Sequence, residues 1–292
     1  MVTAVVHSRD LDGHSSGAII KLKYPDCKVI GFDYGQDLPY EEIKSGEPII
    51  MADVSMKMPQ MLELAKYSNW QLTFIDHHKS AIEDYKKFVG DGESFCTAVL
   101  EDGISACEGT WKYLFPDKQM PRAIKYLGIY DTWRKNESGF DWENEVLPFQ
   151  FGMRMFCNSP ETFPTELFTD DSLTIGIIEK GKTILQYQAQ VNEVNCRNSF
   201  EIKFEGLRAI CLNGAGFNSD VFKSVYDESK HDMMMPFKFD GKTKQWIISM
   251  YGTKDIDLSL IAKKYKGGGH KSACGFQVDD IKQLEGFKSI ML

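Results

Sequence analysis

Acidic residues and histidines gather in short polar segments that each directly follow an apolar run. The densest segment is Asp76-His77-His78, which follows the apolar run Leu72–Ile75. The run Val2–Val6 leads in the same way into His7-Ser8-Arg9-Asp10-Leu11-Asp12-Gly13, and Asp53 follows a third apolar run. Carboxylates and imidazoles are the side chains that ligate divalent metals, so these segments indicate a metal centre.

Together with a later aspartate, these segments supply four carboxylates and two imidazoles. The candidate metal ligands are His7, Asp10, Asp12, Asp53, His77 and Asp131. So much negative charge repels strongly when it is packed together, and two divalent cations bridged by one carboxylate would offset the repulsion. Mixed oxygen and nitrogen ligation favours two Mn²⁺ ions, with Mg²⁺, Fe²⁺ or Co²⁺ as alternatives. Two metals about 3.5–4 Å apart can deprotonate a water and stabilise an in-line phosphoryl displacement.

Spacing excludes other motifs. Asp10-x-Asp12-Gly13 resembles the start of a calcium-binding loop, but the acidic ligand at the twelfth loop position would fall on Lys21. The run Gly267–Gly269 is followed by His270-Lys271-Ser272, whereas a Walker phosphate loop requires Gly-Lys-Ser/Thr. The chain also lacks the H-E-x-x-H motif of zinc proteases.

The elements that must position these residues alternate between strand and helix. Apolar runs predict strands at Val2–Val6, Lys28–Tyr34, Pro48–Ala52 and Leu72–Ile75. Apolar residues at helical spacing predict helices at Ser15–Tyr24 and Met58–Tyr67. Such alternation predicts a mainly parallel sheet, and the carboxyl ends of its strands open onto the crevice where α/β proteins bind ligands.

The pattern changes in the second half of the chain. We expect helices at Thr97–Leu114, Pro121–Tyr130, Leu173–Asn195 and Leu258–Tyr265, and an irregular surface segment or lid over Phe140–Thr169. Strands are predicted at Phe200–Phe204, Arg208–Leu212 and Gln245–Tyr251. The predicted organisation is therefore a metal-binding domain over residues 1–172, a connecting helix over 173–195 and a smaller domain over 196–292.

Composition limits the function and the partners. The net charge of −8, from 34 basic and 42 acidic residues, excludes a broad positive face for long duplex nucleic acid. No apolar run approaches the length of a membrane span, and the N-terminal segment has no signal-peptide pattern. The seven cysteines are scattered without a C-x-x-C pair, which indicates reduced thiols. A cytoplasmic protein without a membrane partner is expected.

Several residues also have simpler interpretations. Asp141 is the alternative to Asp131 as the last metal ligand. His14 and His231 are expected to be surface histidines, and Trp133 is expected to pack rather than to stack on a nucleotide base. The run Met233–Met235 is typical of core or hinge packing.

In chain order, the motifs resemble those of a known enzyme superfamily. His7-x-x-Asp10-x-Asp12-Gly13, Asp53, Asp76-His77-His78 and Asp131 resemble the four motifs of the DHH phosphoesterase superfamily. The run Gly267–Phe276 is similar to the G-G-G-H-x-x-A-x-G-F signature of the domain that accompanies it in nanoRNases and RecJ-like exonucleases. The compact spacing of the first motif resembles the oligoribonuclease branch of the NrnB type.

The resemblance implies a fold and a set of roles. The implied α/β fold has an N-terminal, mainly parallel sheet with helices on both faces, a connecting helix and a smaller α/β C-terminal domain, with an active-site cleft between the domains. It assigns one Mn²⁺ to His7, Asp10 and Asp53. It assigns the other to Asp12, Asp53, His77 and Asp131, so that Asp53 bridges. His78 would meet the scissile phosphate or protonate the leaving oxygen, and Asp76 would orient the site.

Substrate-binding residues follow from the second signature. The resemblance implies that Gly268, Gly269 and His270 hold the terminal phosphate or nucleotide of the substrate. Many relatives have an arginine in the strand before the glycine run, where this chain has Ser249-Met250-Tyr251-Gly252. Phosphate binding is therefore also assigned to candidate cations elsewhere in the chain, namely Arg9, Arg134 and Lys271.

The expected function is a two-metal phosphodiesterase that hydrolyses short oligoribonucleotides or related small nucleotides to mononucleotides. Alternatives in the same enzyme class act on 3′-phosphoadenosine 5′-phosphate, cyclic dinucleotides or polyphosphate. A non-enzymatic nucleotide sensor is disfavoured because no metal ligand is missing. Either a monomer or a homodimer is compatible with the sequence.

Overall fold

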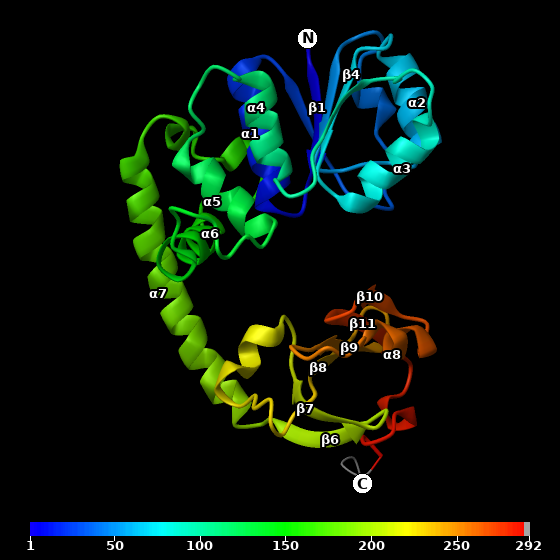
Figure 1. Cartoon of the computed structure of the whole chain (residues 1–292), viewed down its shortest axis with the longest axis vertical. Coiled ribbons are helices and arrows are strands. Elements are labelled where there is room, and N and C mark those ends of the chain that lie inside the picture. The colour runs from blue at the N-terminus through cyan, green and yellow to red at the C-terminus, as the bar shows by residue number, and fades with distance from the viewer. Residues whose placement is uncertain (289–292) are drawn as a thin grey trace. The chain divides into compact units, whose positions relative to one another are not determined.

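The computed structural model describes residues 1–288, and the chain divides into two compact units. The first unit is Met1–Leu185, and the second begins at Gln186 (Figure 1). The division falls inside α7, Asp171–Cys196, which confirms the long helix that the sequence predicted at Leu173–Asn195.

The first unit contains a five-stranded sheet in the order β2-β1-β3-β4-β5, and all its neighbouring strands are parallel. Its strands are β1 Thr3–His7, β2 Lys28–Phe32, β3 Ile49–Ala52, β4 Leu72–Asp76 and β5 Thr97–Leu100. The predicted parallel sheet is confirmed. Its carboxyl ends meet at one edge, which is where the polar segments begin.

Helices cover both faces of this sheet (Figure 1). One face packs against α1 Leu11–Lys23, α4 Ala106–Leu114 and α5 Arg122–Asp131; the other packs against α2 Met58–Tyr67 and α3 Lys79–Val89. Side chains alternate along each strand, so Val6 belongs to the core beside α1 and Val5 to the core beside α2. The predicted two-sided α/β arrangement is therefore confirmed.

Helix α1 is buried almost all round. Ten consecutive residues from Leu11 to Ile20 are buried, because the helix packs against the sheet, α4, α5 and the turn Pro160–Thr162. His14 on this helix is only 6% exposed, and its Nε2 lies 3.2 Å from the carbonyl oxygen of Ser8. The prediction that His14 is a surface histidine was wrong.

Two expectations about the middle of the chain are corrected. Thr97–Leu114 is not one helix: Thr97–Leu100 form edge strand β5, and α4 begins after Ser105 with a capping box that Ser105 and Glu108 make. The segment Phe140–Thr169 is not merely an irregular surface. It contains a π-helical turn, η2, and α6, whose Phe149 is fully buried in the core.

Short elements complete the first unit. They are η1 Tyr40–Glu42, η2 Trp142–Val146, α6 Leu147–Met153, η3 Pro160–Thr162 and η4 Thr165–Phe168.

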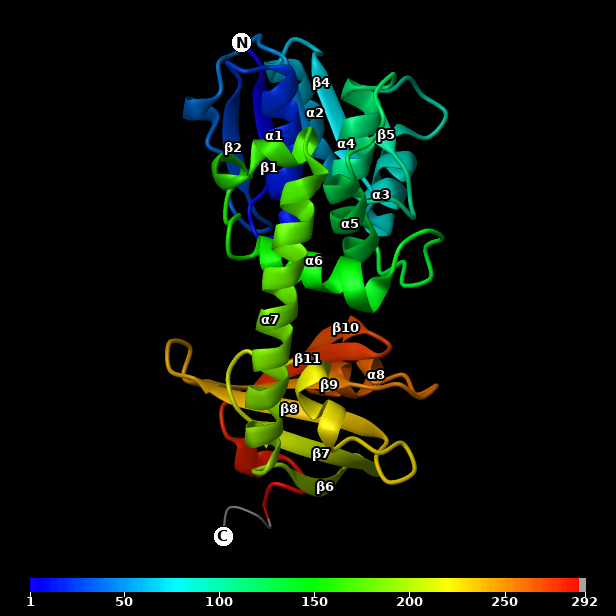
Figure 2. The ribbon, with the colours of Figure 1, turned by 90° about the vertical axis from the view of Figure 1, so that its left-hand side faces the viewer.

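The second unit is built on a six-stranded mixed sheet in the order β10-β11-β9-β8-β7-β6 (Figure 2). Within the described strands of this second sheet, only β7 and β8 pair in parallel. The strands are β6 Phe200–Phe204, β7 Leu207–Asn213, β8 Met233–Asp240, β9 Gln245–Tyr251, β10 Gly268–His270 and β11 Ala273–Val278. The remaining elements are η5 Ser219–Ser224, α8 Ser259–Lys264 and η6 Ile281–Gln283.

Burial in this unit settles two further expectations. Met233–Met235 open β8 and lie in the core, as predicted. His231 is only 2% exposed, and its ring nitrogens contact Glu201 and the backbone N–H of Asp227. The expected surface position of His231 was therefore wrong, because this histidine closes the turn that leads into β8.

All seven cysteines are buried and free. Among the described residues, no helix combines the length and the apolar character that crossing a bilayer requires.

Gly13 allows the start of α1 to approach the end of β1. A Cβ at this position would collide with the carbonyl group and Cβ of His7. We predict that Gly13→Ala lowers the free energy of unfolding by about 1–3 kcal/mol, as overpacking does in cores. Gly176→Ala in α7 is the matched control, because a Cβ there meets no atom within 4 Å. Its higher helix propensity should raise stability by up to about 1 kcal/mol. Urea unfolding measures the free energy of unfolding of both variants. Changes of the same sign in the two variants would contradict the prediction.

Candidate metal centre

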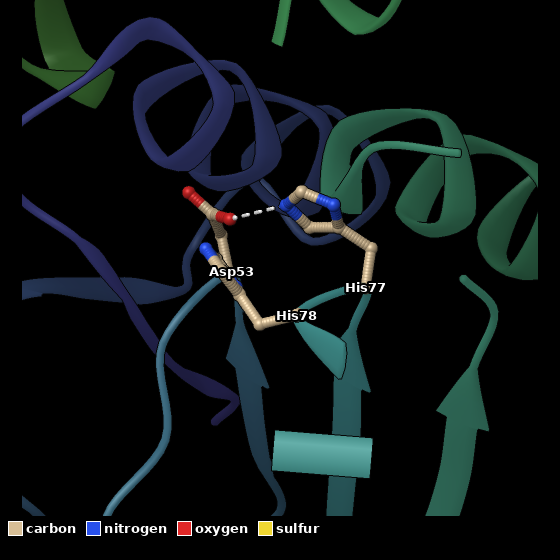
Figure 3. A group of neighbouring side chains, drawn as sticks. All are labelled: Asp53, His77 and His78. Atoms are coloured by element: carbon tan, nitrogen blue, oxygen red, sulfur yellow. Dashed lines mark ion pairs between the residues drawn. The ribbon is translucent and has the colours of Figure 1, made fainter. Parts of the chain in front are cut away.

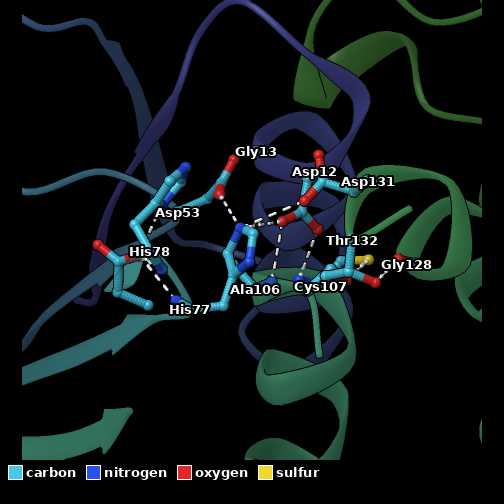
Figure 4. A network of polar contacts seen from close by, with 12 residues as sticks. Asp12, Gly13, Asp53, His77, His78, Ala106, Cys107, Gly128, Asp131 and Thr132 are labelled. Carbon is cyan, nitrogen blue, oxygen red and sulfur yellow. Dashed lines mark hydrogen bonds and ion pairs between the residues drawn. The ribbon is translucent and has the colours of Figure 1, made fainter. Parts of the chain in front are cut away.

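The structure brings all six candidate ligands together at the carboxyl edge of the first sheet. Figure 4 shows Asp12, Asp53, His77 and Asp131 among them. His7 ends β1, Asp10 is the N-cap of α1, Asp12 lies in its first turn, Asp53 follows β3, His77 follows β4 and Asp131 ends α5. The alternative residue Asp141 instead caps η2, where its carboxylate accepts from the backbone N–H of Asn144.

The first group consists of His7, Asp10 and Asp53, whose ligand atoms all lie within 4.8 Å of one another. His7 Nδ1 is 2.7 Å from Asp10 Oδ2 and 3.5 Å from Asp53 Oδ2. The other oxygen of Asp10 accepts a 3.0 Å hydrogen bond from Gly13 N–H at the helix start. Capping α1 thus orients the carboxylate that faces His7.

The second group is centred on His77 Nε2. This atom lies 3.5 Å from Asp12 Oδ2 and 3.3 Å from Asp131 Oδ2. It also lies 3.4 Å from Asp53 Oδ1 (Figure 3). Asp53 therefore presents one oxygen to each group, which is the geometry that a bridging ligand requires.

The backbone at Asp53 is unusual. Its φ is 65°, in the left-handed region, although the residue is buried and is not a glycine. Its N–H donates to the carbonyl of Ile75 on the neighbouring strand, which holds the turn in place. Aspartate and asparagine tolerate this region better than most residues, but the conformation still costs free energy. This free-energy cost therefore occurs at the residue whose two oxygens face both groups.

Asp12 is held by the start of α4. Its two oxygens accept 2.8 Å hydrogen bonds from the backbone N–H groups of Ala106 and Cys107. These amides are free at a helix N-terminus, where the helix dipole also favours a negative charge. These two hydrogen bonds connect Asp12 to residues that lie 94 and 95 positions later in the sequence.

The cluster perturbs the titration of its members. Burial, followed by repulsion from Asp12 and Asp10, raises the pKa of Asp53 well above its ordinary value. The same causes raise the pKa of Asp131 from 3.8 to about 9. Burial also opposes ionisation of Asp10, but hydrogen bonds from His7 and Gly13 lower its pKa to about 2. Burial lowers the pKa of His77.

Two buried atoms indicate what would complete the site. No described residue supplies a hydrogen bond to Asp53 Oδ2 or His77 Nε2, although both atoms are inaccessible to solvent. An unsatisfied buried acceptor is costly, and the surrounding carboxylates repel one another. Divalent cations would satisfy these atoms and offset the repulsion. The residues therefore fit cations that take mixed oxygen and nitrogen ligands.

Asp76 organises the two histidines that follow it. Its Oδ1 accepts from the backbone N–H groups of His77 at 2.7 Å and of His78 at 2.9 Å. The same oxygen lies 2.8 Å from His78 Nδ1, and this hydrogen bond raises the pKa of His78. A ring nitrogen of His78 also lies within 4.8 Å of ligand atoms of Asp53 and His77.

Sequence reasoning missed Asp33 and Tyr34. Asp33 Oδ1 lies 3.5 Å from His7 Nε2, and the Tyr34 ring centroid lies 5.8 Å from that of His7. Strand β2 ends at Phe32, so Asp33 obeys the same rule as the other site residues: it is an acid directly after a parallel strand. The strand predicted from the sequence extended to Tyr34. Asp33 was therefore placed inside the strand and was not recognised as an acid that follows it.

The three candidate phosphate-binding cations all have acidic partners. Arg9 Nε donates to Asp33 at 2.5 Å, and Lys271 pairs with Asp255. Arg134 pairs with Glu108, which is only 1% exposed. Their assignment to substrate remains a prediction.

The glycine-rich run lies in the second unit, beside a cavity of about 930 Å³. Gly268 and Gly269 line this cavity, whereas His270 and Lys271 are not among its lining residues. A Cβ at Gly267 would collide with the Gly275 carbonyl, and Gly269 has a φ of 128°. Only glycine allows the backbone to lie this close to β11.

Comparisons with known proteins bear on the fold. No family model matches the sequence. Uncharacterized protein R106 of Acanthamoeba polyphaga mimivirus is 29% identical over 256 residues, which are 83% of this chain and 56% of that protein. The chain thus spans about half the length of the curated relative it matches.

Solved structures extend this comparison. The pGpG-specific phosphodiesterase PggH from Vibrio cholerae has a TM-score of 0.55 at 11% identity, over 97% of this chain and 95% of its own. An exopolyphosphatase-related protein from Bacteroides fragilis has a TM-score of 0.48 at 14% identity, over 97% of this chain and 88% of its own. The match to PggH establishes a shared fold.

The metal-free protein should lose stability as pH rises. Between pH values near 3.8 and about 9, folded Asp131 keeps a proton that the unfolded chain releases, so the free energy of unfolding falls as pH increases. Urea unfolding with a chelator at about pH 6 and about pH 8.5 measures this fall. Saturating Mn²⁺ should abolish it, because cations replace the protons. Stability that rises with pH in the chelated protein would contradict the prediction.

The variant Asp53→Asn tests the same explanation, because asparagine removes the carboxylate and still tolerates the left-handed backbone. This variant should show a weaker pH dependence of the free energy of unfolding and no stabilisation by Mn²⁺. Asp141→Asn is the control and should keep both, since Asp141 lies outside the two ligand groups.

Proposed function

We propose that the chain, which shares its fold with PggH and whose motifs resemble those of the DHH phosphoesterase superfamily, is a metal-dependent phosphodiesterase that hydrolyses short oligoribonucleotides or related small nucleotides to mononucleotides. The observation that carries this proposal is the position of Asp53, whose two oxygens face two separate groups of ligand-type atoms. PggH, which shares the fold, is named for a guanine dinucleotide substrate. The net charge of −8 also favours a small substrate over a long polyanion.

The proposed assignment of ligands follows the two groups. His7, Asp10 and Asp53 would hold one cation, and Asp12, Asp53, His77 and Asp131 would hold the other. Divalent cations at such a site activate water for attack on phosphorus and offset charge on the phosphoryl oxygens. We propose Mn²⁺ for both positions, with Mg²⁺, Fe²⁺ or Co²⁺ as alternatives, because the donor set mixes carboxylate and imidazole.

His78 is the proposed proton donor. Its Nδ1 is bound to Asp76, so Nε2 is the atom left to meet the scissile phosphate or to protonate the leaving oxygen. The raised pKa of His78 keeps more of its imidazole protonated near neutral pH. Asp76 touches no substrate in this scheme. It positions His77 and His78 through their backbone N–H groups and the His78 ring.

A substrate panel tests the proposed function. Mn²⁺-loaded protein should convert oligoribonucleotides of about two to five residues to mononucleotides while leaving pyrophosphate and polyphosphate intact. 3′-Phosphoadenosine 5′-phosphate and cyclic dinucleotides belong in the same panel, with products resolved by length. Hydrolysis of polyphosphate or pyrophosphate with intact dinucleotides would reject the proposal.

Variants at the Asp76–His78 pair test the proposed proton transfer. His78→Gln should lower kcat by roughly 10²–10⁴-fold, which is the usual contribution of a general acid. Asp76→Asn should lower kcat less and move the alkaline limb of the pH–rate profile to lower pH, because a hydrogen bond from His78 to a carboxylate no longer raises the pKa of His78. An unchanged alkaline limb in Asp76→Asn would show that His78 is not the titrating donor. Mn²⁺ binding by both variants, measured by calorimetry, controls for damage to the site.

A further inference from the structure

Trp133 is an exposed tryptophan that lies close in sequence to the candidate metal ligand Asp131. The residue is 56% exposed, and it follows Asp131 by two positions, so their Cα atoms are no more than about 7 Å apart. Its ring meets the buried Trp142 edge-on, with centroids 5.0 Å apart. The ring also meets that of Tyr130, with centroids 5.8 Å apart, so the expected packing is present, while 56% of the residue stays open to solvent.

The backbone at Trp133 is costly for such a residue. The N–H groups of Trp133 and Arg134 donate to the carbonyls of Tyr130 and Ile129, which is the hydrogen-bond pattern of a Schellman motif. Trp133 occupies the left-handed position of this motif with a φ of 56°, where glycine is normally favoured. Contact of the ring with Trp142 and Tyr130 offsets part of that cost, and the exposed remainder of the ring does not.

A cation lies over one face of the ring. Lys135 Nζ is 4.5 Å from the centroid of the Trp133 ring and 5.3 Å from that of Trp142. Lys135 makes no ion pair within the described part of the chain, in contrast to Arg9, Arg134 and Lys271. An exposed indole next to an unpaired ammonium group is the combination that binds a nucleotide, through its base and its phosphate.

We propose that Trp133 is a stacking platform for a base of the nucleotide substrate and that Lys135 contacts a phosphate of the same ligand. This inference rests on the proposed phosphodiesterase function and names a residue that selects nucleotides over base-free phosphoesters. Stacking on an aromatic ring tolerates every base, so it gives affinity without sequence preference.

The chain contains a matched control. Trp70 is also 56% exposed and also has a left-handed backbone, with a φ of 64°. It precedes β4, at the amino edge of the sheet, whereas the metal centre lies at the carboxyl edge. Replacement by glycine at either position relieves the same kind of backbone strain, and only Trp133 lies near the site.

The experiment compares Trp133→Gly with Trp70→Gly in the Mn²⁺-loaded protein. Substrates are the dinucleotide pApA and an analogue of it that lacks both bases. Trp133→Gly should raise KM for pApA about tenfold, with kcat within about twofold, and leave KM for the base-free analogue unchanged. Trp70→Gly should change neither constant. Thermal unfolding should show that Trp133→Gly is at least as stable as the wild type, because glycine suits the left-handed position. An unchanged KM for pApA, or an equal rise for both substrates, would overturn the inference.

A binding measurement separates this inference from the proposed function. Titration with AMP should quench tryptophan fluorescence in the wild type and in Trp70→Gly, and the quench should be lost in Trp133→Gly. If the wild type cleaves neither substrate, the proposed function fails, while loss of the quench in Trp133→Gly alone still supports stacking. A quench of equal size in all three proteins, or its absence from all three, would refute stacking on Trp133.

Discussion

The mutual repulsion of four carboxylates in a largely buried space is the constraint on which the rest of this site depends. Asp12 and Asp53 are almost inaccessible to solvent, and without cations burial and their neighbours hold the pKa values of Asp53 and Asp131 far above normal. A chain keeps such a cluster only if the surrounding fold fixes each member. The parallel sheet does so by ending three strands at one edge, and the amides at the start of α4 stabilise Asp12.

A second set of polar residues supports the ligands from behind. Glu108 is buried in α4, caps that helix together with Ser105, and pairs with Lys125 and Arg134 on and after α5. The start of α4 binds Asp12, so this network connects the element that holds one ligand to the helix that ends in Asp131. A buried carboxylate with two cationic partners is stable where a lone one is not. The network therefore acts as a brace between α4 and α5, and it explains why Arg134 already has a partner.

Backbone strain occurs beside the proposed chemistry at two positions, for different reasons. At Asp53 the left-handed turn places one carboxylate between two groups of candidate ligands, and at Trp133 it lies two residues after the candidate ligand Asp131. Each conformation costs free energy at a position beside the candidate metal site. The acidic net charge fits the same view, since an aromatic ring can hold a nucleotide without a broad basic surface.

The sequence by itself determined the parallel sheet, its helical faces and the residues at its carboxyl edge, because strand-ending acids and alternating periodicity are local patterns. Tertiary packing decided the rest. Burial of α1 on all sides placed His14 inside, and a strand that ends at Phe32 brought Asp33 to His7. Strand β5 forms by pairing with the edge of β4, and no local sequence pattern predicts that pairing. Long-range contacts of this kind depend on which surfaces meet, and a periodicity of two or 3.6 residues carries no information about them.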